Sequence, residues 1–242
     1  MDMAGFYIPK DGKLGEDAFF VNQKKQTLGI ADGVGGWSRR GIDAGKYARE
    51  LMSNSVISLC DESGGTVNPK RVLNKAYANT KAKGSSTACI ITLKGRWLYA
   101  ANVGDSGFMV FRDKQCVYKS PIQQHGFNHP YQLGNSKKSD TPVCADEIKV
   151  QVENGDVIVA GSDGLFDNMY PHEIVGILGL VEGYAFPEQL AWMIAESASS
   201  NSHDKDLYSP FAKANEEAGF HYLGGKIDDI TVVVGQIGES MK

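Results

Sequence analysis

Acidic residues recur in this sequence at the points where short apolar segments begin or end. Two acidic sites follow an apolar segment, Asp32-Gly33 directly and Asp163-Gly164 after Gly161-Ser162. Two more come directly before an apolar segment, Glu16-Asp17 and Asp228-Asp229. If the apolar segments are strands, these carboxylates lie at the rim of a sheet. The adjoining glycines lack Cβ, so a ligand or a backbone carbonyl can approach closely.

Carboxylates without a neighbouring His or Cys cluster favour hard cations such as Mg²⁺ and Mn²⁺. A zinc site is not indicated, because the four cysteines lie far apart, with no CxxC pair and no His at ligand spacing. Asp-Gly is also a frequent turn dipeptide. The spacing alone therefore leaves two interpretations open, metal ligands and ordinary turns.

Composition narrows the class of protein. The 242 residues are 42% hydrophobic and carry 25 basic and 29 acidic side chains, a net charge of −4. Such a chain can bury a sizeable core, and without a dense Lys/Arg block it predicts no nucleic-acid partner. No apolar run approaches the ~20 residues of a membrane span. The first residues show no hydrophobic signal core and no Arg/Ser-rich stretch, so we expect a targeting peptide to be absent or removed. We expect a soluble, intracellular protein.

Periodicity predicts the elements that position the carboxylates. Strands are expected at residues 18–21, 28–31, 87–93, 97–103, 108–111, 157–160 and 230–237. Helices are expected from Asp43, an N-cap, to about residue 59, from Asn68-Pro69 to about residue 77, and over residues 171–180 and 187–197. A polar, mobile stretch is expected at 199–206. The apolar face of the first helix is formed by Ala44, Tyr47, Ala48, Leu51, Met52, Val56 and Leu59.

The close succession of strands between residues 86 and 118 favours antiparallel pairing, because parallel strands need longer crossovers. The fold class is therefore α+β, with helices on the outer faces of mainly antiparallel sheets. No linker or repeat divides the chain, so residues 1–242 are expected to form a single domain.

Six motifs, in order along the chain, resemble those of the metal-dependent type 2C protein serine/threonine phosphatases. They are Gly15-Glu16-Asp17, Ala31-Asp32-Gly33, Gly84-Ser85-Ser86-Thr87-Ala88, Val103-Gly104-Asp105-Ser106, Gly161-Ser162-Asp163-Gly164-Leu165-Phe166-Asp167 and Asp228-Asp229-Ile230-Thr231-Val232. The segment ADGVGGW at residues 31–37 resembles a small organelle-associated branch of that family. The resemblance spans nearly the whole chain. It implies a four-layer α-β-β-α sandwich, two sheets flanked by helix pairs, with a two-metal centre at one end.

The resemblance also implies metal ligands. Asp32 would bridge two ions, and Gly33 would offer its carbonyl. Glu16 would hold one ion, while Asp163 and Asp228 would hold the other. The ions implied are Mg²⁺ or Mn²⁺.

Three more residues take their expected roles from the resemblance. Asp17 would be catalytic and orient the attacking water. Asp105, together with the Asp163 region, matches the position of a weaker third ion. Asp229 aligns with the usual Asn of the family.

The activity implied is hydrolysis of phosphoserine and phosphothreonine in proteins by direct attack of a water activated by two metal ions. We expect a monomeric, single catalytic domain that acts on a phosphorylated protein. The branch resemblance favours a mitochondrion or chloroplast; otherwise the cytoplasm is expected.

The sequence departs from the family pattern at two positions. Val34 stands where many members have a His that serves as general acid, and none of the five histidines is marked by a motif. Gly12 stands where the family has an Arg that grips phosphate. Lys13 is expected to bind substrate in its place, with Lys10 as the other candidate, each as a point charge without bidentate geometry.

These departures leave two other functions open, a catalytically weak phosphoprotein-binding regulatory module and a metallophosphoesterase for small molecules. The glycine-rich segment at residues 33–37, followed by Arg39 and Arg40, has two interpretations. It is either a phosphate cradle, though it lacks the GxxxxGK[ST] pattern, or a flexible turn that leads into the helix at Asp43. Residues 123–141 are expected to form a long loop that bears on substrate choice.

Overall fold

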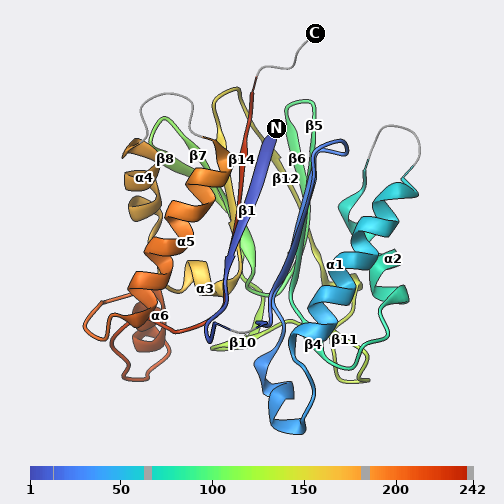
Figure 1. The fold of residues 1–242 in the computed structure, drawn as a ribbon, viewed down its shortest axis with the longest axis horizontal. Coiled ribbons are helices and arrows are strands. Elements are labelled where there is room, and N and C mark those ends of the chain that lie inside the picture. Colours follow the sequence, from blue (N-terminus) through green and yellow to red (C-terminus); the bar gives the residue numbers. More distant parts are fainter. Residues whose placement is uncertain (13, 63–66, 181–185, 239–242) are drawn as a thin grey trace.

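Two five-stranded antiparallel sheets form the centre of the computed structural model, which describes all residues except 13, 63–66, 181–185 and 239–242 (Figure 1). Across the first sheet the order is β1 (Asp2–Ile8), β14 (Ile230–Gln236), β13 (Val157–Gly161), β7 (Gly107–Arg112) and β8 (Gln115–Lys119). Across the second it is β12 (Asp146–Gln151), β6 (Trp97–Val103), β5 (Ala88–Lys94), β3 (Thr27–Ala31) and β2 (Ala18–Asn22).

Helices cover the outer face of each sheet, which gives the four layers seen in Figure 1. The second sheet is covered by α1 (Gly45–Cys60) and α2 (Pro69–Asn79). The first is covered by α4 (Pro171–Leu180) and α5 (Pro187–His203), with α3 (Asp163–Phe166) and α6 (Pro210–Glu217) towards the lower end of the molecule. Short 3-10 helices span Gly35–Arg40 and Pro142–Cys144. The predicted α+β sandwich with flanking helix pairs is confirmed.

Three apolar clusters hold the four layers together. In β14, Val232 and Val234 pack towards the helices beside the first sheet, whereas Val233 packs between the two sheets. Successive side chains of a strand point to opposite faces, so strands buried on both faces need continuous apolar runs. That is why these segments have few polar residues. Tyr47 and Leu51 of α1 fill the third cluster, against the second sheet.

Most predicted elements agree with the structure to within one or two residues. Asn68 caps α2, since its Oδ1 accepts a hydrogen bond from the Arg71 backbone N–H at 2.8 Å. The first helix begins at Gly45, two residues after the predicted start. Asp43 still accepts a hydrogen bond from the Gly45 backbone N–H at 3.0 Å. The placement of Val56 on the buried face of this helix is wrong, because 36% of that residue is exposed.

The prediction of a mobile segment at 199–206 is wrong over its first half, because α5 continues to His203. Tertiary packing supports this extension: a Cβ on Gly225 would lie 2.0 Å from the Asn201 carbonyl oxygen, so only glycine allows so close an approach. Residues 124–134 of the expected long loop also contain structure. β9 (Gln124–Gly126) pairs with β10 (His129–Pro130), and β11 (Leu133–Gly134) pairs with β4 (Ser85–Ser86).

Among the described residues, no helix combines the length and the apolarity needed to cross a membrane.

Candidate metal centre

Strand pairing brings the predicted acidic residues to one end of the sandwich. Ala18 at the start of β2 lies opposite Ala31 at the end of β3, and Gly161 at the end of β13 lies opposite Val232 near the start of β14. The residues just beyond these strand ends therefore meet. They surround a cavity of about 270 Å³ whose lining includes Glu16, Asp32, Gly33, Asp105, Asp163 and Asp228. All six predicted metal-site residues line this one cavity, and their role as ligands stays a prediction.

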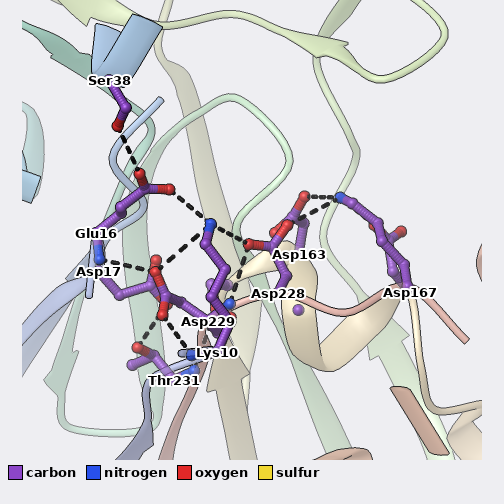
Figure 2. Close-up of polar contacts among 12 residues, drawn as sticks. Lys10, Glu16, Asp17, Ser38, Asp163, Asp167, Asp228, Asp229 and Thr231 are labelled. Carbon is purple, nitrogen blue, oxygen red and sulfur yellow. Dashed lines mark hydrogen bonds and ion pairs between the residues drawn. The ribbon is translucent and has the colours of Figure 1, made fainter. Parts of the chain in front are cut away.

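Lys10 lies among the carboxylates on one side of this cavity (Figure 2). Its Nζ is 2.7 Å from Glu16 Oε2, 3.2 Å from Asp228 Oδ1 and 3.9 Å from Asp229 Oδ2. Burial alone would lower the pKa of Lys10, but the surrounding carboxylates, Asp228 first, raise it above its usual value. The ammonium therefore stays charged and offsets part of the negative charge of the site.

Lys226 has the same relation to the carboxylates on the other side. Its Nζ is hydrogen-bonded to Asp163 Oδ2, lies 2.7 Å from Asp167 Oδ2 and is 3.4 Å from Asp228 Oδ2. Sequence reasoning gave no role to Lys226 or Asp167. The spacing in the sequence could have indicated Asp167, because it follows Asp163 by four residues, which places both carboxylates on the same side of one helical turn.

Three carboxylate oxygens in this region are buried and have no hydrogen-bond partner among the described residues: Asp17 Oδ1, Asp105 Oδ1 and Asp163 Oδ1. A buried, unpaired carboxylate oxygen is costly unless a cation binds it. In the described part of the chain, no three His, Cys, Asp or Glu side chains are arranged to hold a metal ion; here the two lysines lie between the carboxylates. The orphaned oxygens and the all-oxygen donor set nevertheless fit a hard divalent cation.

The raised pKa values of two carboxyl groups also favour a bound cation at this site. Burial raises the pKa of Asp32 well above its usual value, and the charges of Asp17, Asp163 and Asp228 add to this effect. Burial, followed by the charge of Asp163, raises the pKa of Asp105 to about 7. Two ammonium groups are thus too few for the negative charge gathered here.

Asp17 is buried directly before β2 and is not part of the cavity lining. Its Oδ2 accepts a hydrogen bond from Thr231 Oγ1 at 2.7 Å, which fixes the orientation of the carboxyl group (Figure 2). Burial raises the pKa of Asp17, and after burial its charge is the largest contribution to the raised pKa of Asp32. The two carboxyl groups therefore interact directly through their charges.

Glycine is required beside the carboxylates. A Cβ on Gly33 would lie 2.5 Å from the carbonyl oxygens of both Glu16 and Ala44, and a Cβ on Gly164 would lie 2.1 Å from the Asp229 carbonyl oxygen. Both distances are far below van der Waals contact. The two Asp-Gly sites are therefore places of close backbone approach.

The glycine-rich segment after Asp32 does not bring arginine to the cavity. Arg39 and Arg40 are exposed and are not part of its lining, and Arg40 instead lies over the Trp37 ring at 5.2 Å. Trp37 Nε1 donates a hydrogen bond to Ser85 Oγ at 2.7 Å and so anchors the turn. The interpretation of residues 33–40 as a phosphate cradle with an arginine is not supported.

The remaining predicted features are placed as follows. Val34, which stands at the position of the family's general-acid His, lines the cavity. None of the five histidines is part of this lining. Lys13 lies outside the described residues, so its role in substrate binding stays a prediction. The segment 123–141 does reach the site, because Gln124 Nε2 donates to Asp105 Oδ2 at 3.1 Å and Asn128 lines the cavity.

No family model matches the chain, but individual proteins do. An Arabidopsis thaliana protein named "Probable protein phosphatase 2C 55" is 50% identical over 238 residues, which cover 97% of this chain. The chain spans 51% of that relative, about half of its length.

Solved structures show the same similarity. The photosystem II phosphatase PBCP is 35% identical, with a TM-score of 0.91, over 97% of this chain and 98% of its own. The catalytic domain of the serine/threonine protein phosphatase PstP, solved in complex with two manganese ions, shares the fold with a TM-score of 0.68 at 16% identity, over 98% of each chain.

Proposed function

The chain belongs to the protein phosphatase 2C family, and from this premise we propose that it hydrolyses phosphoserine and phosphothreonine monoesters in proteins with the aid of two divalent ions. The observation that carries the proposal is the cavity between the two sheets, where predicted ligands from both ends of the chain converge and buried carboxylate oxygens lack partners. The two manganese ions in the PstP structure belong to that protein, and they support the same ion count here.

Five groups would hold the ions: the carboxylates of Glu16, Asp32, Asp163 and Asp228 and the carbonyl oxygen of Gly33. When bound, two divalent ions activate water as a nucleophile and neutralise the charge that develops on the phosphoryl oxygens. Mg²⁺ and Mn²⁺ both suit this donor set.

The chain's own residues orient the reactants. Thr231 holds the Asp17 carboxyl group next to the cavity, and the resemblance to the family gives this carboxyl group the role of orienting the attacking water. Lys10 lines the cavity and can bind a phosphoryl oxygen. Of the two lysines expected to replace the missing arginine, we therefore favour Lys10. Because Val34 cannot donate a proton, a water molecule would have to protonate the departing alkoxide.

We further propose that residues 1–242 act as one monomeric catalytic domain, which is supported by a site that needs both Glu16 and Asp228. The placement in a mitochondrion or chloroplast stays a prediction, based on the motif at residues 31–37. The 35% identity to a photosystem II phosphatase is consistent with the chloroplast.

A metal titration with a chromogenic phosphate ester tests the proposal and its rivals. Protein stripped with EDTA should hydrolyse p-nitrophenyl phosphate only after Mg²⁺ or Mn²⁺ is added, and Asp163→Asn should stay at the level of the stripped protein. A regulatory module would show no metal-dependent hydrolysis. A small-molecule esterase would prefer metabolite esters to a phosphopeptide.

A further inference from the structure

The Lys226 ammonium is the most enclosed cation of the site. Its side chain is 16% exposed, and three carboxylates lie within 3.4 Å of Nζ: Asp163, Asp167 and Asp228. The Phe211 ring lies 5.3 Å from Nζ and adds a cation–π contact. A lysine with three carboxylate partners and an aromatic neighbour differs from a mobile surface lysine.

The backbone of Lys226 is held as firmly as its side chain. The fully buried side chain of Asn168 accepts from the Lys226 N–H and donates to the Lys226 carbonyl oxygen, both at 2.8 Å. Asn168 also donates to the Gly164 carbonyl oxygen at 2.8 Å, next to Asp163. The Lys226 backbone is thus tied to the same helical turn whose carboxylates the ammonium neutralises.

We propose that the Lys226 ammonium is a fixed cation of this centre, standing where a third divalent ion would otherwise bind beside Asp105, Asp163 and Asp167, so that the chain binds two divalent ions and not three. The proposal rests on the proposed metal-dependent function. It replaces the expectation of a weak third ion at Asp105.

The contacts of the individual carboxylate oxygens support a count of two divalent ions. Asp163 Oδ2 accepts a hydrogen bond from Lys226 Nζ. Asp163 Oδ1 is buried, has no hydrogen-bond partner and remains available to one of the two ions. Asp167 gives Oδ2 to Lys226 and does not line the cavity. A divalent ion on this side would share both carboxylates with an ammonium, and the repulsion between the two cations would oppose its binding.

Asp105 is the third carboxylate on this side of the site. It lines the same cavity, and its charge interacts with those of Asp163, Asp167 and Lys226. Its Oδ2 already accepts a hydrogen bond from Gln124. With Lys226 present, Asp105 faces a cation that is part of the chain. Without Lys226, the three carboxylates would be left without their cation and could take a metal ion.

Counting bound Mn²⁺ tests the proposal without measuring activity. The full chain is stripped with EDTA and titrated with Mn²⁺ to millimolar concentration, and free Mn²⁺ is measured by its EPR signal. We expect two bound ions for the unaltered chain, three for Lys226→Met and two for Lys226→Arg, which keeps the charge. Lys10→Met removes one positive charge from the other side of the cavity and should leave the count at two.

Three ions bound by the unaltered chain, or two bound by a folded Lys226→Met, would overturn the proposal. If Lys226→Met does not fold, Asp105→Asn in the unaltered chain decides: the count stays at two if no ion binds there, and a lower count contradicts the proposal. A chain that binds no Mn²⁺ would refute the proposed function itself, a result distinct from a count of three.

Discussion

The Asp229 carboxylate accepts a hydrogen bond from the Glu16 backbone N–H at 2.7 Å and so joins two residues 213 positions apart. Its other oxygen accepts from the Lys10 backbone N–H at 2.9 Å, and the residue is only 2% exposed. An Asp can accept both bonds, whereas an Asn has a single acceptor oxygen. Asp229 therefore contributes to the site without binding metal, because it fixes the segment that carries Lys10 and Glu16.

Removing this clamp should weaken both the fold and the site. Asp229→Ala leaves two backbone N–H groups without their acceptor, so we expect the free energy of unfolding to fall by about 2–3 kcal/mol, measured by urea denaturation. The metal concentration needed for half-maximal activity should also rise. Asp11→Ala removes an exposed carboxylate from the same segment and should change neither quantity. If the two variants had the same free energy of unfolding and the same metal requirement, Asp229 would not be what fixes this segment.

Gly33 is expected to tolerate no side chain. The Cβ of Gly33→Ala would lie 2.5 Å from two carbonyl oxygens, so the backbone has to shift, at a cost of about 1–3 kcal/mol. Thermal unfolding and phosphatase assays should show loss of both stability and activity. Gly126→Ala is the control, because nothing lies within 4 Å of its Cβ and the residue does not line the cavity. A Gly33→Ala protein as stable and active as the control would show that the close approach is unimportant.

Lys10 is expected to act on substrate affinity more than on turnover. If its ammonium binds a phosphoryl oxygen, Lys10→Ala should raise KM for a phosphopeptide about tenfold, as expected for one lost charge-assisted hydrogen bond. Steady-state kinetics at saturating Mn²⁺ measures this, with the exposed Lys24→Ala as control. An unchanged KM would exclude Lys10 and leave Lys13 as the candidate to test.

The raised pKa of Asp105 predicts a pH-dependent stability for the metal-free protein. Burial, then the charge of Asp163, raises this pKa from 3.8 to about 7. The folded state therefore binds the proton more tightly than the unfolded state, and ionisation of Asp105 costs stability as the pH rises. Asp105→Asn is neutral at every pH. It should stabilise the EDTA-treated protein by about 4 kcal/mol at pH 8 and about half as much at pH 5.

Urea denaturation at the two pH values, with EDTA present, provides the measurement. A stabilisation that is constant, or that grows as the pH falls, would show that the carboxyl group is not held in its neutral form. Asp113→Asn, which replaces an exposed carboxylate at the turn between β7 and β8, is the control for the substitution itself.

The fold class could be predicted from the sequence because it depends on local patterns, whereas the resemblance to the family was needed to pick out the carboxylates that line the cavity. Apolar strands such as 157–161 are buried on both faces, and Asp-Gly at their ends needs no distant partner to be recognised. β1 was not predicted, because its residues follow no clear alternation, Gly5 lies inside it, and its main partner is β14, more than 200 residues away. Its existence depends on tertiary pairing.

The parts of the site that escaped prediction depend on distant contacts in the same way. Lys226 looks like an ordinary loop lysine in the sequence, and only the fold brings it to Asp163 and Asp167. The clamp formed by Asp229 is equally invisible, because its two partners are backbone groups that any residue type supplies. The resemblance to the family identified carboxylate positions but gave no indication of Lys226.

Whether the chain is a metal-dependent phosphatase is tested by phosphate release from a phosphothreonine peptide. The release is measured for the unaltered chain and for Asp32→Asn, each with EDTA or with Mn²⁺. Asp32 lies in the cavity and is the proposed bridge between the two ions. We predict release only by the unaltered chain and only with Mn²⁺. Release in EDTA, or comparable release by a folded Asp32→Asn protein, would contradict a metal-dependent phosphatase built on these carboxylates.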